Sequence, residues 1–226
     1  MCNYSSTISF WNNIFHNKVN KVPQKIENII MQNDIEAAIK FLTTDSKVIL
    51  DYGCGSGTML LKCAIHSNIE KCIGIDISNE AILLSSKAAT YNHLKHKFSL
   101  KCDDLSYLST LNENSIDGCI LSNILDNVTI NDCDKIMNYI NKITKPNGKI
   151  LIKLNPYLND KKLNEYGLTL LNDNLYIEKE GIYLRNLDTS EWTSLIENYF
   201  SIVNFKEIYF DEFNQFNRLF LLFNKK

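Results

Sequence analysis

Short apolar runs rich in β-branched residues alternate with segments of helical period along the middle of the chain. The runs are KVILDYG, KCIGIDIS, KFSLKCDD, SIDGCILSN and KILIKLNP, and the helical segments include TMLLKCAIH, NEAILLSSKAATYN and DCDKIMNYINKIT. Strands joined through helices pair in parallel by right-handed crossovers. The pattern therefore predicts an α/β fold, a doubly wound and mostly parallel sheet with helices on both faces.

The last third of the chain has a different pattern. Residues 168–187, LTLLNDNLYIEKEGIYLRNL, contain three short alternating runs split at residues 172–174 and 180–181. This pattern predicts a small antiparallel β insertion. The segments FKEIYFDEF and RLFLLFNKK then predict an antiparallel pair that closes the sheet edge.

Several turn and helix signals subdivide the chain. Pro23 is predicted to open a helix in PQKIENII, Asp34 to cap the helix IEAAIKFL, and a Ser or Thr near Glu191 to cap the helix in DTSEWTSLIENYF. A turn is expected at residues 146–148, Pro-Asn-Gly.

No stretch is rich enough in Pro, Gly or Ser to separate two domains. We therefore expect one domain over residues 1–226. Its expected parts are an N-terminal helical lid or cap (1–44), a cofactor-binding core (45–155), and a substrate-side insertion with closing strands (156–226).

Composition narrows the class of protein. The formal charge of −2 does not favour nucleic acid, which attracts strongly basic chains through counterion release. The seven cysteines, from Cys2 to Cys133, form no CxxC pair, so no metal site or disulfide framework is expected. MCNYSSTISF shows no signal peptide, and no apolar run reaches the ~18 residues of a membrane span. We expect a cytoplasmic monomer or homodimer with reduced thiols and no membrane partner.

Three of the eight glycines stand within five positions, at Gly53, Gly55 and Gly57, directly after the first predicted strand. Glycine lets backbone approach a ligand closely, and ligands of open α/β sheets bind beyond the carboxyl ends of the strands. The second strand ends in Asp76, where a carboxylate can accept hydrogen bonds from ribose hydroxyls. The third ends in Asp103 and Asp104, either of which could reach an adenine amino group.

The glycine spacing argues against a dinucleotide. Dinucleotide sites use G-x-G-x-x-G, with the pyrophosphate at a helix N-terminus. Here the spacing is G-x-G-x-G, and Asp51 stands two residues before the first glycine. A carboxylate there favours a cationic ligand. An adenosine that carries a sulfonium and an amino-acid ammonium fits this description.

These motifs together resemble the class I S-adenosylmethionine-dependent methyltransferases. ILDYGCGSG resembles their first motif, GIDIS their acidic ribose-binding loop, KCDDLSYL their adenine loop, and SIDGCILSNIL and KPNGKILI the strands that follow. The resemblance covers about residues 45–155. It implies a seven-stranded sheet with the last strand antiparallel, and S-adenosylmethionine as the cofactor.

The resemblance also implies roles for individual residues. Backbone near Gly53 and Gly55 would bind the methionine part, Asp76 the ribose, and Asp104 with Leu105 the adenine. The predicted cofactor-binding residues are Asp51, Gly53, Cys54, Gly55, Gly57, Asp76, Ile77, Asp104, Leu105 and Asn123. Structural alternatives stay open: the glycines can serve a plain turn, and Asp76 can cap the next helix unless Ser78 does so.

Candidate residues for the acceptor side are fewer. Asn123 and Asp126 follow the fourth strand, where either could orient a nucleophile or take a proton, although Asp126 could equally cap a turn. LNPY at residues 154–157 resembles the Asn-Pro-Pro-Tyr of amino-group methyltransferases, but it has one Pro and follows the fifth strand. We interpret it as a turn that ends that strand.

The N-terminal segment and the insertion supply the remaining candidates. Trp11 and Phe15 are at helical spacing, which predicts a lid over the cofactor by residues 4–20 or a plain packing helix. Tyr183 and Arg185 are candidates for a substrate pocket.

The sequence thus predicts methyl transfer to a small-molecule acceptor, mainly by positioning and exclusion of water. No basic tract or RNA-binding appendage is present. The alternatives are an RNA or protein methyltransferase and a non-catalytic S-adenosylmethionine-binding module.

Overall fold

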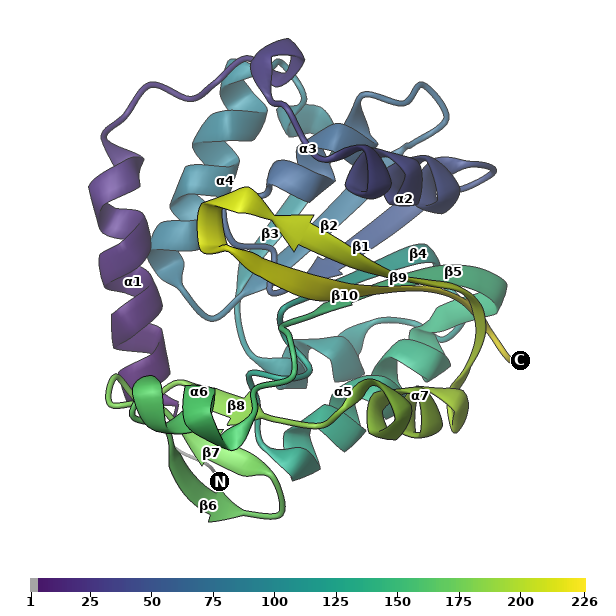
Figure 1. Ribbon diagram of the computed structural model, residues 1–226. Coiled ribbons are helices and arrows are strands. Elements are labelled where there is room, and N and C mark those ends of the chain that lie inside the picture. Colours follow the sequence, from purple (N-terminus) through teal and green to yellow (C-terminus); the bar gives the residue numbers. More distant parts are fainter. Residues whose placement is uncertain (1–3) are drawn as a thin grey trace.

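The computed structural model describes residues 4–226, so residues 1–3, with Cys2 among them, lie outside the described part. Its centre is a seven-stranded sheet with the strand order β3-β2-β1-β4-β5-β10-β9 (Figure 1). The strands are β1 (Val48–Tyr52), β2 (Lys71–Asp76), β3 (Phe98–Cys102), β4 (Ile116–Ser122), β5 (Thr144–Leu154), β9 (Phe200–Phe210) and β10 (Gln215–Asn224). The strand order reverses between β1 and β4, which is where open sheets of this kind bind ligands.

The directions of the strands agree with the sequence pattern. Neighbours among β1 to β5 pair in parallel, whereas β10 pairs antiparallel with both β5 and β9. This confirms the doubly wound, mostly parallel sheet with its last strand antiparallel. The central strands read as nearly continuous apolar runs because both faces of the sheet are covered.

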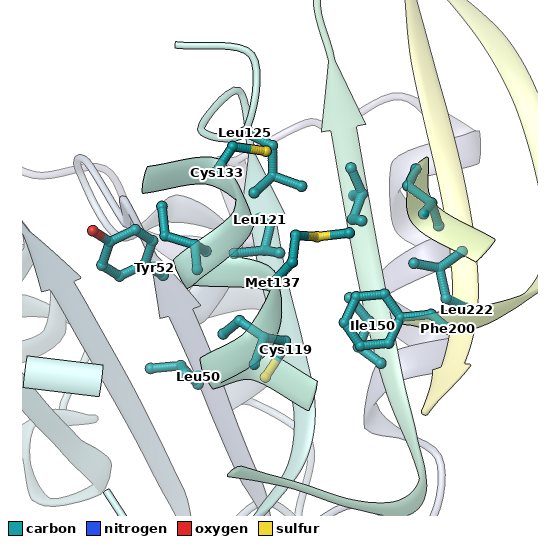
Figure 2. Close-up of a cluster of buried hydrophobic side chains, with 14 of the residues drawn as sticks. Leu50, Tyr52, Cys119, Leu121, Leu125, Cys133, Met137, Ile150, Phe200 and Leu222 are labelled. Atoms are coloured by element: carbon teal, nitrogen blue, oxygen red, sulfur yellow. The ribbon is translucent and has the colours of Figure 1, made fainter. Parts of the chain in front are cut away.

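Helices cover the two faces of the sheet (Figure 1). One face carries α2 (Asn33–Thr43), α3 (Thr58–Ala64) and α4 (Asn79–Tyr91), and the other carries α5 (Ile130–Ile143) and α7 (Thr189–Glu197). Figure 2 shows the core under α5, where Cys133 and Met137 point toward Leu121 of β4. Burial of these apolar side chains supplies most of the driving force for this packing.

Three helix starts differ from the sequence prediction. The segment after Pro23 forms only a 3-10 turn, Ile26–Asn28, and α2 begins two residues earlier than expected, with Gln32 as its N-cap. The cap of α7 is Asp188, whose side chain accepts from the backbone of Glu191 while Glu191 accepts from the backbone of Asp188. This capping box satisfies two of the free amides at the helix start.

The Pro-Asn-Gly turn is absorbed into β5. Ile116 of β4 pairs with Thr144, but Gly118, two residues on, pairs with Lys149. The extra residues of β5 loop out at this point, and Asn147 has a φ of +58°. The turn signal was therefore correct, although the strand begins before it.

The predicted antiparallel insertion is confirmed as a separate three-stranded sheet. It follows α6 (Asp160–Glu165) and contains β6 (Thr169–Asn172), β7 (Leu175–Ile177) and β8 (Tyr183–Arg185) in that spatial order. The first helix, α1 (Ser5–Val19), runs from the side of α4 down to this small sheet (Figure 1). The hydroxyl of Thr7 donates to the carbonyl of Gly181 (2.8 Å), and the hydroxyl of Ser78 donates to Oδ1 of Asn12 (2.7 Å). At the end of the helix, Nζ of Lys87 donates to the carbonyl of Val19 (3.0 Å). Contacts near the start, middle and end of α1 thus hold it across the sheet edge.

None of the helices between residues 4 and 226 combines the length and the apolar character that a bilayer crossing requires.

Candidate active site

A cavity of about 840 Å³ opens at the carboxyl ends of the central parallel strands. Its inner wall consists of the loops after β1, β2, β3 and β4, and its outer wall consists of α1, the start of α5 and the β7–β8 turn. The inner wall includes Gly53, Gly55, Asp76, Ile77, Asp103, Asp104, Leu105, Ser106, Asn123 and Ile124. The structure therefore brings most of the predicted cofactor-binding residues into one cavity.

The glycine loop presents bare backbone to this cavity. Gly53 and Gly55 have φ values of +79° and +51°, which favour glycine. A Cβ added to Gly53 would lie 2.0 Å from Cδ1 of Ile124, and one added to Gly55 would lie 3.3 Å from Cζ of Phe15. A side chain at either position would therefore intrude into the cavity wall.

Gly57 and Cys54 have structural positions instead. Gly57, with a φ of +74°, is the N-cap of α3, and a Cβ there would lie 2.1 Å from Oγ of Ser85. The sulfur of Cys54 lies against Gly74 of β2. Neither residue lines the cavity formed by the described residues, and their assignment as cofactor contacts stays a prediction. Burial raises the pKa of the Cys54 thiol, so it stays protonated.

Asp76 connects the first two loops. Its Oδ2 accepts a hydrogen bond from the amide of Gly55 (2.8 Å), and its Oδ1 accepts one from the amide of Ser78 (2.8 Å). Ser78 itself caps α4 by accepting from the amide of Ala81 (3.1 Å). The alternative in which Ser78 caps the helix is therefore the observed one. The Asp76 carboxylate lines the cavity.

Asp103 and Asp104 both line the next part of the cavity. Leu105 and Ser106, which follow them in the chain, line it as well. Oδ1 of Asp104 accepts from the amide of Ser106 (2.7 Å) and starts the 3-10 turn Leu105–Thr110. Oδ1 of Asp103 accepts from the amide of Asp104 (2.9 Å). The geometry leaves both carboxylates at the wall, so the choice between them as the adenine contact stays a prediction.

Asp51 lies in β1 behind the glycine loop and does not line the cavity. It is buried, and its Oδ1 has no hydrogen-bond partner among the described residues. Burial, and then the negative charge of Asp76, raise the pKa of Asp51 to about 8. A cation held near the loop would relieve both effects.

The acceptor-side candidates divide into two groups. Asn123 lines the cavity with a φ of +56°, a left-handed backbone conformation that asparagine adopts more readily than most residues. Asp126 is fully buried behind the wall, where its Oδ2 accepts from the amide of Asn155 (2.6 Å). Asp126 is not among the residues that line the cavity, and its candidacy as a catalytic group stays a prediction.

Tyr183 and Arg185 also lie behind the wall. The ring of Tyr183 meets the ring of Tyr4 edge-on (centroids 5.7 Å apart), and the guanidinium of Arg185 lies over the ring of Trp192 (5.5 Å). Neither is among the residues that line the cavity. The insertion contributes Glu178 and Ile182 instead, both from the β7–β8 turn.

The N-terminal helix supplies an aromatic wall. Phe10, Trp11 and Phe15 line the cavity, and the rings of Trp11 and Phe15 stack with centroids 5.9 Å apart. The expected position of Trp11 over the site therefore agrees with the structure. Whether this helix moves as a lid stays a prediction.

Several wall residues gave no usable signal in the sequence. The hydroxyl of Tyr4 donates to Oδ2 of Asp132 (2.8 Å), and Lys135 pairs with Oδ1 of the same carboxylate (3.2 Å). Asn155, in the LNPY segment that we interpreted as a turn, lies at the wall beside Asn127. The sequence did not indicate Asn155 as a site residue, because the segment has a single Pro and follows the fifth strand instead of the fourth. Among the described residues no group of three or more His, Cys, Asp or Glu could hold a metal.

A family model described as "Methyltransferase domain" matches residues 43–186. The chain belongs to this methyltransferase family. The matched region begins at the end of α2 and ends just after β8, so it contains the glycine loop, both acidic loops and most of the insertion. The family assignment made from the sequence is confirmed.

Curated relatives of this methyltransferase chain match only part of their own length. A protein named ribosomal protein L11 methyltransferase from Vibrio parahaemolyticus is 30% identical over 112 residues, 50% of this chain and 35% of that protein. One from Aliivibrio fischeri is 30% identical over 109 residues, 48% of this chain and 34% of that protein. The chain thus matches about a third of the length of these relatives.

Solved structures share the fold at low identity. The 1,6-didemethyltoxoflavin-N1-methyltransferase of Burkholderia thailandensis, with bound 1,6-didemethyltoxoflavin and S-adenosylhomocysteine, has a TM-score of 0.71 at 13% identity over 98% of this chain and 88% of its own. The N-methyltransferase NodS of Bradyrhizobium japonicum, with S-adenosylhomocysteine, has a TM-score of 0.65 at 12% identity over 96% and 99%. The [4+2]-cyclase SpnF has a TM-score of 0.69 at 13% identity over 96% and 94%.

Proposed function

We propose that this chain transfers a methyl group from S-adenosylmethionine to a small-molecule acceptor. The observation that carries the proposal is that one cavity adjoins both the glycine and acidic loops and a second wall made by α1, α5 and the insertion. Its volume of about 840 Å³ lies within the range of pockets that enclose small ligands. One space of this kind suits a donor and a small acceptor together.

The donor set fits S-adenosylmethionine. The backbone of Gly53 and Gly55 forms a cradle that a Cβ would fill, and Asp51 has a buried carboxylate oxygen with no partner among the described residues. A positively charged methionine part suits this acidic surrounding, Asp76 suits a ribose, and Leu105 offers an apolar face for a base. When bound, the cofactor supplies an activated methyl group on a sulfonium whose sulfur keeps the electron pair of the broken bond.

The protein's own contribution is position and shielding. Holding two reactants in line can lower a barrier by roughly 7–11 kcal/mol in favourable intramolecular systems. Phe10, Trp11 and Phe15 close the outer side of the cavity and exclude water. Glu178, whose pKa is raised by burial and by the nearby Glu180, lines the acceptor end as a group able to hold a proton.

A protein acceptor is the second candidate, and the names of the curated relatives favour it. This chain matches only about a third of the length of those relatives. Their names therefore support a protein acceptor less directly than the cavity wall of α1 and the insertion supports a small one. A non-catalytic module is the third, because the fold shared with a cyclase does not by itself establish methyl transfer.

The test is transfer of labelled methyl from S-adenosylmethionine into an extract of the source cell, separated into metabolites, protein and nucleic acid. We expect label in the metabolite fraction, with formation of S-adenosylhomocysteine. Label in a protein or RNA band would support the other acceptor classes. Binding of S-adenosylhomocysteine with no transfer into any fraction would support the non-catalytic module.

A further inference from the structure

The charges of this chain are unevenly distributed, although its formal charge is only −2. Residues 4–26 and 81–102 contain seven lysines, three of the four histidines and none of the 26 Asp and Glu residues. The first stretch is α1 with the segment after it, and the second is most of α4 with β3. All acidic side chains therefore lie in other parts of the chain.

The two stretches without acidic residues lie side by side. Nζ of Lys87 donates to the carbonyl of Val19 (3.0 Å), and Nδ2 of Asn92 donates to the carbonyl of Gln24 (3.1 Å). The segment 18–26, here called the strap, therefore runs along the C-terminal half of α4. It lies at the end of α1 that is far from the small sheet (Figure 1).

The strap and the end of α4 together form a basic surface. Its exposed lysines are Lys18, Lys21, Lys25, Lys87 and Lys95. Within the described residues only Lys25 among them has an ion-pair partner, Glu27 at 3.8 Å. An exposed pair of this kind contributes little. On the far edge of the sheet, by contrast, Lys206 pairs closely with Asp34 (2.6 Å). The basic surface therefore presents positive charge that the protein itself does not neutralise.

Large apolar side chains are exposed among these lysines. Val22 on the strap is 78% exposed, and Leu83 and Tyr91 on α4 are each 41% exposed. Leu83, Lys87 and Tyr91 are four residues apart, so they share one face of α4. Apolar side chains next to basic ones are typical of surfaces that bind at a bilayer interface.

Two kinds of polyanion could pair with the basic surface, and its apolar side chains favour one of them. Single-stranded nucleic acid stacks its bases on aromatic rings, but Val22 and Leu83 are aliphatic and offer no ring. Aliphatic side chains can instead enter the acyl boundary of a bilayer. Tyr91 suits the same place, because tyrosine is enriched where one end is apolar and the other is wet.

We propose that the basic surface docks this chain on a bilayer with anionic headgroups, with its lysines at the headgroups and Val22 below them. Each lysine near an anionic leaflet strengthens binding about fivefold. The inference goes beyond the proposed function and does not depend on it. It departs from the sequence-based expectation of no membrane partner, which rested on the lack of a spanning segment.

The test is cosedimentation of the full chain with vesicles of phosphatidylcholine alone and of equal amounts of phosphatidylcholine and phosphatidylserine. We expect binding to the mixed vesicles only, and weaker binding as added salt screens the charges. The triple variant Lys18→Ala, Lys21→Ala and Lys25→Ala should reduce binding by roughly tenfold or more. Val22→Ser should reduce it about tenfold, because an apolar side chain of this size leaves the bilayer.

Matched controls lie on and beside the insertion, at the opposite end of α1. The triple variant Lys161→Ala, Lys162→Ala and Lys179→Ala removes the same charge from exposed positions. Leu171→Ser replaces an aliphatic side chain that is 50% exposed. Both controls should bind the mixed vesicles as the wild type does, and all variants should keep the melting temperature of the wild type.

Equal losses in the two triple variants would overturn the docking surface, because net charge alone would then explain the binding. Failure of the wild type to bind the mixed vesicles would overturn it directly. Binding of an oligouridylate in preference to the mixed vesicles, lost in the strap variant, would also overturn it and would assign the surface to nucleic acid.

Discussion

Asp51 is a residue whose environment can be read from the pH dependence of stability. Its pKa is raised to about 8, so the folded state holds a proton that the unfolded state releases near pH 4. A raised folded-state pKa contributes stability that is full below the unfolded value and is lost as the pH rises to about 8. The loss approaches about 1.4 kcal/mol per pH unit at its steepest.

We expect Asp51→Asn to remove this loss, because asparagine does not titrate. The free energies of unfolding of the variant and the wild type should then diverge between pH 4 and 8. Above about pH 8 the two curves should run parallel. Urea denaturation over this range measures the difference. Parallel curves over the whole range would show that the Asp51 carboxylate is not isolated in the ligand-free protein.

Gly53 combines two constraints that a control can separate. At Gly167 φ is +65° and an added Cβ has no neighbour within 4 Å, so Gly167→Ala should cost only the backbone strain of about 1–2 kcal/mol. Gly53→Ala adds a contact of 2.0 Å with Ile124 and should cost more. Urea denaturation of both variants measures the excess. Equal losses would mean that Ile124 moves aside freely.

For single residues, the sequence was enough to predict the acidic loops of the cavity, but it did not predict the residues of the outer wall. Asp76 and Asp104 follow predicted strands directly, so the topology alone carries them to the cavity. Asp126 lies four residues past the end of β4, where local pattern does not determine which way a side chain points. It turned into the core to bind the backbone of Asn155.

Among the elements, α1 determines whether the cavity is closed. Of its residues only Thr7 and Val19 are buried, so its removal should leave the sheet intact. It nevertheless places Trp11 and Phe15 over the glycine loop. We expect deletion of residues 1–20 to leave a cooperatively folded domain that binds S-adenosylhomocysteine at least tenfold more weakly, measured by melting temperature and calorimetry.

Fluorescence of Trp11 in a Trp192→Phe background supplies the control, because Trp192 is fully buried in the core. The Trp11 signal should respond to S-adenosylhomocysteine. A silent Trp11, or a truncated protein that does not fold, would show that α1 is a fixed part of the core rather than a cover for the site.

The elements also show where sequence patterns stop. The strands were predicted correctly because both faces of the sheet are buried. A strand buried on both faces must be apolar along its length, and this requirement outweighs local turn or cap signals. Helix starts were less predictable, because Asp34 pairs with Lys206 instead of capping α2, and the side chain of the N-cap residue Gln32 makes no capping hydrogen bond. The path of α1 depends on contacts such as Thr7 with Gly181, which are 174 residues apart and leave no local trace.

For the whole molecule, alternating strand and helix patterns were enough to predict the sheet, its antiparallel closing strand and the insertion. The acceptor wall was not predictable, since α1, α5, β5 and the β7–β8 turn meet there only after folding. The single-domain boundaries and the monomer or homodimer state remain predictions.

The central claim is that the loops after β1 and β2 hold S-adenosylmethionine with Asp76 as a main contact. Calorimetry with S-adenosylhomocysteine tests it most directly, on wild type and on Asp76→Ala, with NAD as the comparison ligand. We expect wild type to bind S-adenosylhomocysteine and not NAD. A folded Asp76→Ala protein should lose about 1–3 kcal/mol of binding free energy, the range for hydrogen bonds to a charged group. Unchanged affinity in that variant, or binding of NAD in preference to S-adenosylhomocysteine, would contradict the account.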